Sequence, residues 1–160
     1  MKRILIITLA IMSFISSPSW GETMDDLVER EGTYYKKFTD VPFTGQVEGK
    51  RQGSFKNGKH EGTWVRYWDN GQLMFKGDYK NGEAEGSHER YYDNGQVKAK
   101  GDYKNGKEEG PLVSYWDNGQ LRSKGDYKDG KQEGYWVGYT KEGSVIKGTG
   151  TYKDGVKISD

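Results

Sequence analysis

A unit of 24 residues recurs along most of this chain. Its first glycine stands at Gly53, Gly77, Gly101 and Gly125, and the unit returns one residue late at Gly150. The hexapeptide Gly-Asp-Tyr-Lys-Asn-Gly at Gly77 is repeated without change at Gly101, and at Gly125 only its Asn is replaced by Asp. A fixed period of this length is typical of stacked supersecondary units that contact only their neighbours. The chain is therefore expected to be a repeat array.

Each unit is predicted to contain two β-strands and two tight turns. In the first unit, the alternating segments 62–69 and 72–79 flank Asn70-Gly71. Asn-Gly between such segments is a strong hairpin signal, because a type I′ turn needs positive φ at both positions. The other turn pairs begin at Asn57, Asn81, Asn94, Asn105, Asn118, Asp129 and Asp154. The predicted fold is all-β: an elongated, single-layer, twisted antiparallel β-meander built from 24-residue, two-stranded repeats.

The turn at Asn70-Gly71, taken as a two-residue loop, predicts which side chains share a face. Counting outward gives the pairs Trp68–Leu73, Arg66–Phe75, Trp64–Gly77 and Gly62–Tyr79. We call this side the tryptophan face and expect it to be the packed one, since large rings there cover glycines. Its later members are expected to be Tyr92, Val97, Tyr103, Leu112, Trp116, Leu121, Tyr127 and Trp136. The opposite side, the tyrosine face, is expected to be more polar and to carry Thr63, Val65, Tyr67, Met74, Lys76 and Asp78.

The N-terminal residues 1–21 are typical of a signal peptide. A basic start is followed by the apolar run 4–15 and by small residues, which predicts cleavage before Glu22. An uncleaved N-terminal anchor is the alternative. Residues 22–52 are then expected to form an N-terminal cap with a first degenerate repeat, and residues 53–160 the repeat array. The protein is expected to be periplasmic or secreted.

Composition narrows the classes of partner. Removing 21 of the 160 residues leaves 139, with 23 of the 25 basic residues against 24 acidic ones. This near-neutral balance argues against nucleic acid and makes a membrane surface an unfavoured partner. The chain has no cysteine, and only 32% of its residues are hydrophobic, although 14% are aromatic. Tyrosine and tryptophan suit half-exposed pleated surfaces, so the composition favours a thin sheet over a disordered chain.

The repeated text resembles MORN repeats (membrane occupation and recognition nexus), in the shorter bacterial variant that is often labelled antitoxin-like. The matching residues are Tyr79 to Gly82, Glu85-Gly86 and Tyr91 to Gln96, and the segment Tyr34 to Gly45 is similar to the first unit of small exported members. The resemblance implies elongated antiparallel sheets that contact proteins or lipids. It does not imply catalysis.

Two sets of aromatic residues are candidates for partner binding. Tyr67, Tyr91, Tyr115 and Tyr139 recur at one position of the unit and form a ladder with steps of about 10 Å. They either dock a partner or pack against each other and against lysine stems. The second set, Trp64, Arg66, Trp68, Tyr92, Trp116 and Trp136, has the composition of an interaction hot spot. It is either structural cover or a partner surface.

Metal, cofactor and catalytic sites are not expected. Asp78 is predicted to face Glu85, and the equivalent pairs are Asp102 with Glu109 and Asp126 with Glu133. Two carboxylates are too few for calcium, so flanking lysines are the better account of their proximity. His60 and His88 occupy different positions of the unit, and the sequence contains no nucleophile motif.

The sequence therefore predicts a non-catalytic, exported repeat protein that acts as a protein–protein interaction scaffold in the cell envelope. A cell-wall glycan-binding module with exposed Trp and Tyr is the alternative, and an antitoxin-like or membrane-associated protein ranks third. Another protein is the expected partner. Charged residues Lys153, Asp154 and Lys157 are expected to protect the C-terminal sheet edge. The N-terminal edge shows no such protection, which allows end-to-end self-association.

Overall fold

The computed structural model describes residues 21–160, so the predicted signal peptide lies outside the described residues except for Gly21. No helix in this range is long and apolar enough to cross a membrane. The elements, in chain order, are β1 (Glu22–Thr23), the 3-10 helix η1 (Met24–Asp26), β2 (Leu27–Arg30), β3 (Thr33–Lys36), β4 (Gly45–Glu48), β5 (Arg51–Lys56), β6 (Lys59–Tyr67), β7 (Leu73–Lys80), β8 (Glu83–Tyr91), β9 (Val97–Lys104), β10 (Lys107–Tyr115), β11 (Leu121–Lys128), β12 (Lys131–Gly138), β13 (Gly150–Lys153) and β14 (Val156–Ser159).

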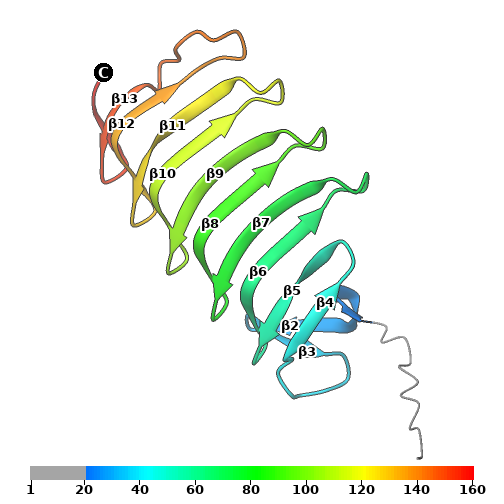
Figure 1. Cartoon of the computed structure of the whole chain (residues 1–160). Coiled ribbons are helices and arrows are strands. Elements are labelled where there is room, and N and C mark those ends of the chain that lie inside the picture. The colour runs from blue at the N-terminus through cyan, green and yellow to red at the C-terminus, as the bar shows by residue number, and fades with distance from the viewer. Residues whose placement is uncertain (1–20) are drawn as a thin grey trace, which may run out of the picture.

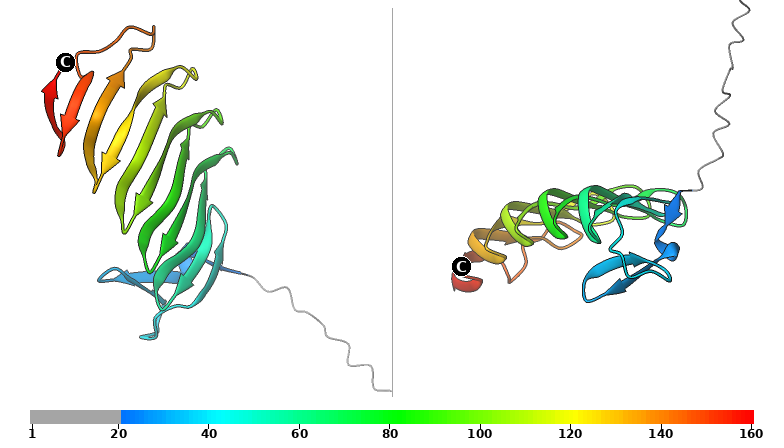
Figure 2. Two further views of the ribbon diagram at one scale, coloured as in Figure 1. Left: turned by 60° about the vertical axis from the view of Figure 1, so that its left-hand side comes forward. Right: turned by 90° about the horizontal axis from the view of Figure 1, so that it is seen from below.

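Twelve of the strands form one long sheet, in which β4 to β14 follow each other in chain order and β1 lies outside β4 (Figure 1). Every neighbouring pair in it is antiparallel except β1 with β4. The sheet is a single twisted layer that stays open (Figure 2). The predicted all-β meander is therefore confirmed.

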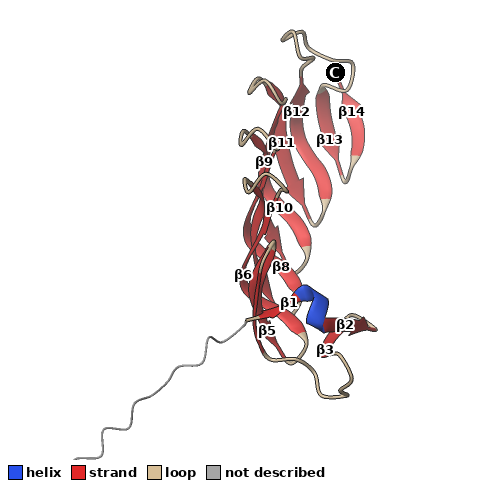
Figure 3. Cartoon of the chain, turned by 90° about the vertical axis from the view of Figure 1, so that its right-hand side faces the viewer, coloured by secondary structure: helices blue, strands red, loops and turns tan. Residues whose placement is uncertain are grey.

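The hairpin of β2 and β3 lies on one side of the first strands (Figure 3). It contributes Leu27 to a small cluster with Val47, Phe55 and Trp64, each of which is buried. Met24 and Tyr34 pack against the same cluster. The tryptophan face is thus covered at its N-terminal end, whereas no second layer of the described residues 21–160 covers the later repeats. In the later repeats, the sheet surface is buried only by side chains that lie across neighbouring strands.

The Asn-Gly turns fall into two classes, and one of them corrects our prediction. At Asn81, Asn105 and the equivalent turns, the first residue has φ of 49–52° and the glycine has positive φ, as a type I′ turn requires. At Asn70 only Gly71 has positive φ. The amide of Trp68 donates to the carbonyl of Gln72 at 2.8 Å, so this loop contains three residues instead of two. The loops at Asn94 and Asn118 are built in the same way.

The longer loop shifts the register beside it by one residue. Arg66 still pairs with Phe75, but Tyr67 rather than Trp68 is opposite Leu73. A β-bulge separates the two pairs and leaves Met74 as the additional residue. Val97 and Leu121 pair in the same way with Tyr91 and Tyr115. The prediction that Leu73, Val97 and Leu121 lie on the tryptophan face is therefore wrong, and they share the tyrosine face.

A second irregularity bends every repeat at its Glu-Gly pair. Gly77 pairs with His88 and Asp78 with Glu85, so two additional residues lie on the β8 side. Gly86 has φ of 68°, which is the left-handed region that glycine adopts without strain. The same shift occurs where β6, β10 and β12 meet the preceding strand. These repeated bends curve the strands while leaving the predicted pairing of Asp78 with Glu85 intact.

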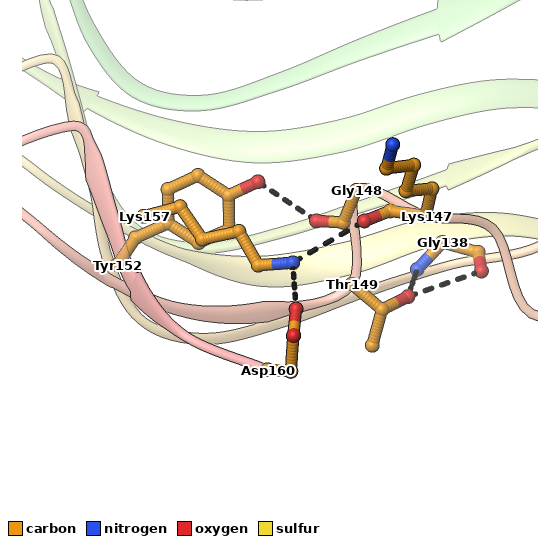
Figure 4. Close-up of polar contacts among 7 residues, drawn as sticks. All are labelled: Gly138, Lys147, Gly148, Thr149, Tyr152, Lys157 and Asp160. Atoms are coloured by element: carbon orange, nitrogen blue, oxygen red, sulfur yellow. Dashed lines mark hydrogen bonds and ion pairs between the residues drawn. The ribbon is translucent and has the colours of Figure 1, made fainter.

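The C-terminal end is held by polar contacts with the backbone (Figure 4). The Tyr152 hydroxyl donates to the Gly148 carbonyl at 2.7 Å, and the Gly138 amide donates to Thr149 Oγ1 at 3.0 Å. Lys157 folds back onto the Lys147 carbonyl and pairs with Asp160. Lys157 lies on the edge strand β14, and its ammonium group makes both of these contacts. A β-bulge interrupts the pairing of β13 with β14.

Candidate functional site

One column of side chains on the tryptophan face covers the glycines of the preceding strands. The Trp64 ring lies over Gly53 and the Trp136 ring over Gly125. Trp64 Nε1 donates to the Ser54 carbonyl at 3.1 Å, and Trp136 Nε1 donates to the Asp126 carbonyl at 2.9 Å. Both tryptophans are 6% exposed. The indole rings of both tryptophans are thus packed against the sheet and their N–H groups are hydrogen-bonded to it. These two residues therefore have a structural role.

His88 occupies the tryptophan position of its repeat. Its ring lies over Gly77, and its Nε2 is 2.9 Å from the Asp78 carbonyl. It reproduces both contacts that Trp64 makes in the preceding repeat. Leu112 stands at the same position over Gly101. The sequence predicted only that His60 and His88 occupy different positions of the unit, and the 24-residue spacing of His88 from Trp64 was the signal that could have revealed this role.

A second aromatic column joins each repeat to the next. Trp68 Nε1 donates to the Tyr91 carbonyl at 3.3 Å, and the equivalent Trp116 Nε1 donates to the Tyr139 carbonyl at 3.0 Å. Tyr92 makes the same contact with the Tyr115 carbonyl at 2.9 Å. Cations cover two of the rings: Arg122 lies 4.8 Å above the ring centroid of Trp116, and Lys98 lies 5.4 Å from that of Tyr92. These rings therefore have limited free area for a ligand.

The glutamates of the Glu-Gly pairs form a ladder at the opposite edge of the sheet. Glu85 Oε2 accepts from the Asn105 amide of the next turn at 3.0 Å, and Glu109 Oε2 accepts from the Asp129 amide at 2.9 Å. Glu61 and Glu133 make the equivalent contact. Backbone amides of the turns thus compensate the negative charge of the paired carboxylates. We had predicted that flanking lysines would do so.

Replacing Glu85 by alanine is expected to lower the free energy of unfolding by about 1 kcal/mol, because the Asn105 amide loses a charged acceptor. Glu83, an exposed residue of the same strand, is the matched control, and its replacement is expected to change stability by less than about 0.5 kcal/mol. Urea unfolding followed by circular dichroism measures both. Equal losses would contradict a specific role for the Glu85 carboxylate.

The tyrosine face carries a stripe of tyrosine and aliphatic side chains, with one such pair in each of four repeats. Each tyrosine of the ladder pairs with an aliphatic residue across its hairpin. The pairs are Tyr67–Leu73, Tyr91–Val97, Tyr115–Leu121 and Tyr139–Val145. We call these eight residues the tyrosine stripe. The four tyrosines are half-buried, and Val145 is 61% exposed. The stripe crosses four consecutive repeats.

Beside the stripe lies a shallow groove of about 480 Å³. Pro111, Val113 and Val137 supply apolar wall, together with Tyr135, which is 59% exposed. The groove is also lined by Lys100, Asp102, Lys124 and Asp126. The tyrosine face is therefore less polar than we predicted, and in its C-terminal half it combines apolar surface with balanced charges.

Tyr91 is the stripe residue with the clearest electrostatic perturbation. Its hydroxyl donates to the Glu89 carboxylate, which raises the pKa of Tyr91 to about 12. Lys100 Nζ lies 2.6 Å from Glu89 Oε1, and this contact together with Tyr91 holds the pKa of Glu89 below its usual range. Glu89 replaces the valine found at this position in the other repeats. The tyrosine face is therefore charged beside Tyr91 and apolar at the equivalent position of the other repeats.

We expect alkaline titration to reveal this contact. Since the folded pKa of Tyr91 lies above its unfolded value near 10, its contribution to stability is complete below pH 10 and is lost as the pH rises towards 12. Burial also raises the pKa of Tyr34, Tyr79, Tyr103 and Tyr127, so the variants identify the contribution of Tyr91 to the ultraviolet absorbance of tyrosinate, which is expected near pH 12. Glu89→Gln should move that ionisation towards pH 10, and Tyr91→Phe should remove it. An unchanged titration in both variants would contradict the assignment.

The ten predicted partner-binding residues are thus distributed over both faces. Trp64 and Trp136 are buried, and Trp68, Tyr92 and Trp116 connect repeats. Arg66 is exposed, and the four tyrosines lie on the stripe. The aliphatic partners of the stripe were missed because a one-residue bulge determines their face.

The geometry agrees with comparison to known proteins. The family model described as MORN repeat variant matches residues 61–81, 84–105 and 108–129. Comparison with curated proteins gave no match. MORN repeats are generally modules for interaction with proteins or membranes, and the family is typically non-catalytic. The three matched segments are consecutive and coincide with the repeats of β6 to β11. Over residues 61–129, the repeats of this chain match the MORN repeat variant family.

Proposed function

We propose that this protein is a non-catalytic interaction scaffold of the cell envelope that binds another protein through its tyrosine face. The observation that carries the proposal is the tyrosine stripe, which stays partly exposed across four repeats. Contiguous apolar surface on a soluble domain usually marks an interaction site, and tyrosine is enriched at such sites. The signal-like sequence of residues 1–21 supports placement in the periplasm or outside the cell.

The shape of the surface favours a protein over a glycan. Sugar rings stack on free aromatic faces, but Arg122 and Lys98 cover the rings of Trp116 and Tyr92. The stripe instead alternates tyrosine with leucine or valine, which suits apolar side chains spaced about 10 Å apart on an extended partner. Balanced lysines and aspartates beside the groove supply a polar rim.

Site-specific photo-crosslinking tests this proposal in the intact envelope. A crosslinking amino acid is placed at Tyr115, on the stripe, and in a second variant at Arg122, which lies in the same hairpin on the tryptophan face. We expect a single protein crosslinked from position 115, identified by mass spectrometry, and a much lower yield from position 122. Sacculus fragments recovered without a protein would favour the glycan alternative.

Mutation separates specific binding from general capture. Replacing Leu121 by serine removes apolar surface from the stripe and is expected to reduce the crosslink from position 115 at least about fivefold, since loss of a buried apolar side chain costs about 1 kcal/mol or more at an interface. Replacing the exposed Lys128 by serine should leave the yield unchanged. A crosslink that is insensitive to Leu121→Ser would contradict binding through the stripe.

A further inference from the structure

Three arginines lie on one rung of the tryptophan face, near its N-terminal end. Arg51 of β5 pairs with Arg66 of β6, Arg66 pairs with Phe75 of β7, and Phe75 pairs with Arg90 of β8. Paired residues share a face, so these side chains form a line that crosses four adjacent strands. With strands about 4.8 Å apart, the three arginines span about 15 Å. We call this line, with Phe75, the arginine row.

The repeat itself does not require these arginines. The same rung continues across β9 to β12 as Ala99, Ser114, Ser123 and Gly138. Small residues therefore satisfy the fold at the positions that carry arginine in the first repeats. Two arginines directly opposite each other are unfavourable unless something compensates their charge. The row is a local departure from the repeat that disfavours folding.

Acidic side chains do not compensate the row. Among residues 21–160, none of the ion pairs or side-chain hydrogen bonds involves Arg51, Arg66 or Arg90, and all three are exposed. Glu29 of the covering hairpin lies near the Tyr34 ring without forming an ion pair with the row. Burial and the neighbouring Glu29 raise the pKa of Tyr34, whereas the charges of Arg51 and Arg66 oppose the shift, as expected if both guanidinium groups lie near this ring.

Two cavities meet along the row. The first, of about 120 Å³, is lined by Arg51, Arg66 and Phe75, together with Tyr34, His60 and Tyr79. The second, of about 380 Å³, is lined by Arg66, Phe75, Tyr79 and Arg90, together with Trp68 and Lys98. Arg66, Phe75 and Tyr79 belong to both. The two cavities therefore adjoin along the row and combine cations with aromatic rings, and within residues 21–160 no acidic side chain lines either of them.

We propose that the arginine row binds an organic oxyanion, a phosphate or carboxylate group attached to a flat ring. Planar guanidinium groups bind both anions through paired hydrogen bonds, and Arg51 and Arg66 are adjacent enough to hold one group together. Phe75, between Arg66 and Arg90, is half-buried and lines both cavities, so the exposed part of its ring can contact the organic part of the ligand. The bound anion would supply the charge compensation that the row lacks. This site is separate from the tyrosine stripe, so either is testable without the other.

Calorimetric titration with phenyl phosphate and with benzoate, at low ionic strength, tests the site. We expect saturable binding of at least one of them, stronger than that of inorganic phosphate, which lacks the ring. Arg66→Gln and Arg90→Gln should each weaken binding about tenfold or more, because each removes a charge-assisted contact. Arg122→Gln is the matched control: it removes one positive charge from the same face outside the row and should leave the affinity unchanged.

Melting temperatures provide a second test of the arginine row. Without ligand, Arg66→Gln is expected to keep or raise the melting temperature, since it removes like-charge repulsion, and phenyl phosphate should raise the melting temperature of the wild-type protein more than that of the variant. A ligand-free variant that melts markedly lower would make Arg66 a structural residue and overturn the proposal. So would the absence of binding to every probe, or an equal loss with Arg122→Gln. Binding to phosphatidylglycerol vesicles alone would assign the arginines to a lipid surface instead.

Discussion

Trp64→Ala is expected to lower the free energy of unfolding by about 3–5 kcal/mol. The ring is 6% exposed, lies over Gly53 and packs with Leu27, Val47 and Phe55. The variant also leaves the Ser54 carbonyl without its indole donor. Because this cluster joins the β2–β3 hairpin to the sheet, the loss should appear in urea unfolding followed by circular dichroism.

The chain itself suggests the control. His88 makes the equivalent contacts in the next repeat, so Trp64→His should preserve a ring over Gly53 and a ring nitrogen facing the Ser54 carbonyl. We expect this variant to retain a substantial part of the stability that Trp64→Ala loses. Equal losses in the two variants would contradict the equivalence of Trp64 and His88.

Gly125→Ala is expected to destabilise the protein by about 1–3 kcal/mol, which is typical of an overpacked site. A methyl group at this position would overlap the Trp136 ring, whose N–H is held by the Asp126 carbonyl and which therefore has little freedom to move. Thermal unfolding monitored by tryptophan fluorescence gives the effect.

Gly101→Ala is the matched substitution one repeat earlier. There the nearest atom is Leu112 Cδ1, at 3.3 Å from the added carbon, and a leucine side chain can adjust by that small amount. The expected change is within about 0.5 kcal/mol. If the two alanine variants were equally destabilised, the requirement for glycine would come from the strand and not from the covering ring.

The arrangement of the repeats could be predicted well because it depends on local signals. Asn-Gly turns and alternating segments each act over a few residues, and they agree with the fixed period in the units that begin at Gly53, Gly77 and Gly101. They were sufficient for the antiparallel order and for the pairs Arg66–Phe75 and Trp64–Gly77. The candidate site was less predictable. Trp64 and Trp136, which the sequence left open as structural cover or partner surface, are both buried.

The sequence by itself determined the repeat and the single-layer meander, because alternating segments and short turns are local signals. It also predicted the type I′ turns at Asn81, Asn105 and their equivalents, where both turn residues have positive φ. Only the tertiary structure decided what each face presents. Asn70 and Asn81 precede glycine alike, yet Asn70 also donates to the Asp93 carbonyl of the next repeat at 2.7 Å and lies in a three-residue loop. The bulge beside that loop places Leu73 with Tyr67. Since side chains alternate with a period of two, one additional residue exchanges the faces, and the tyrosine stripe exists for that reason.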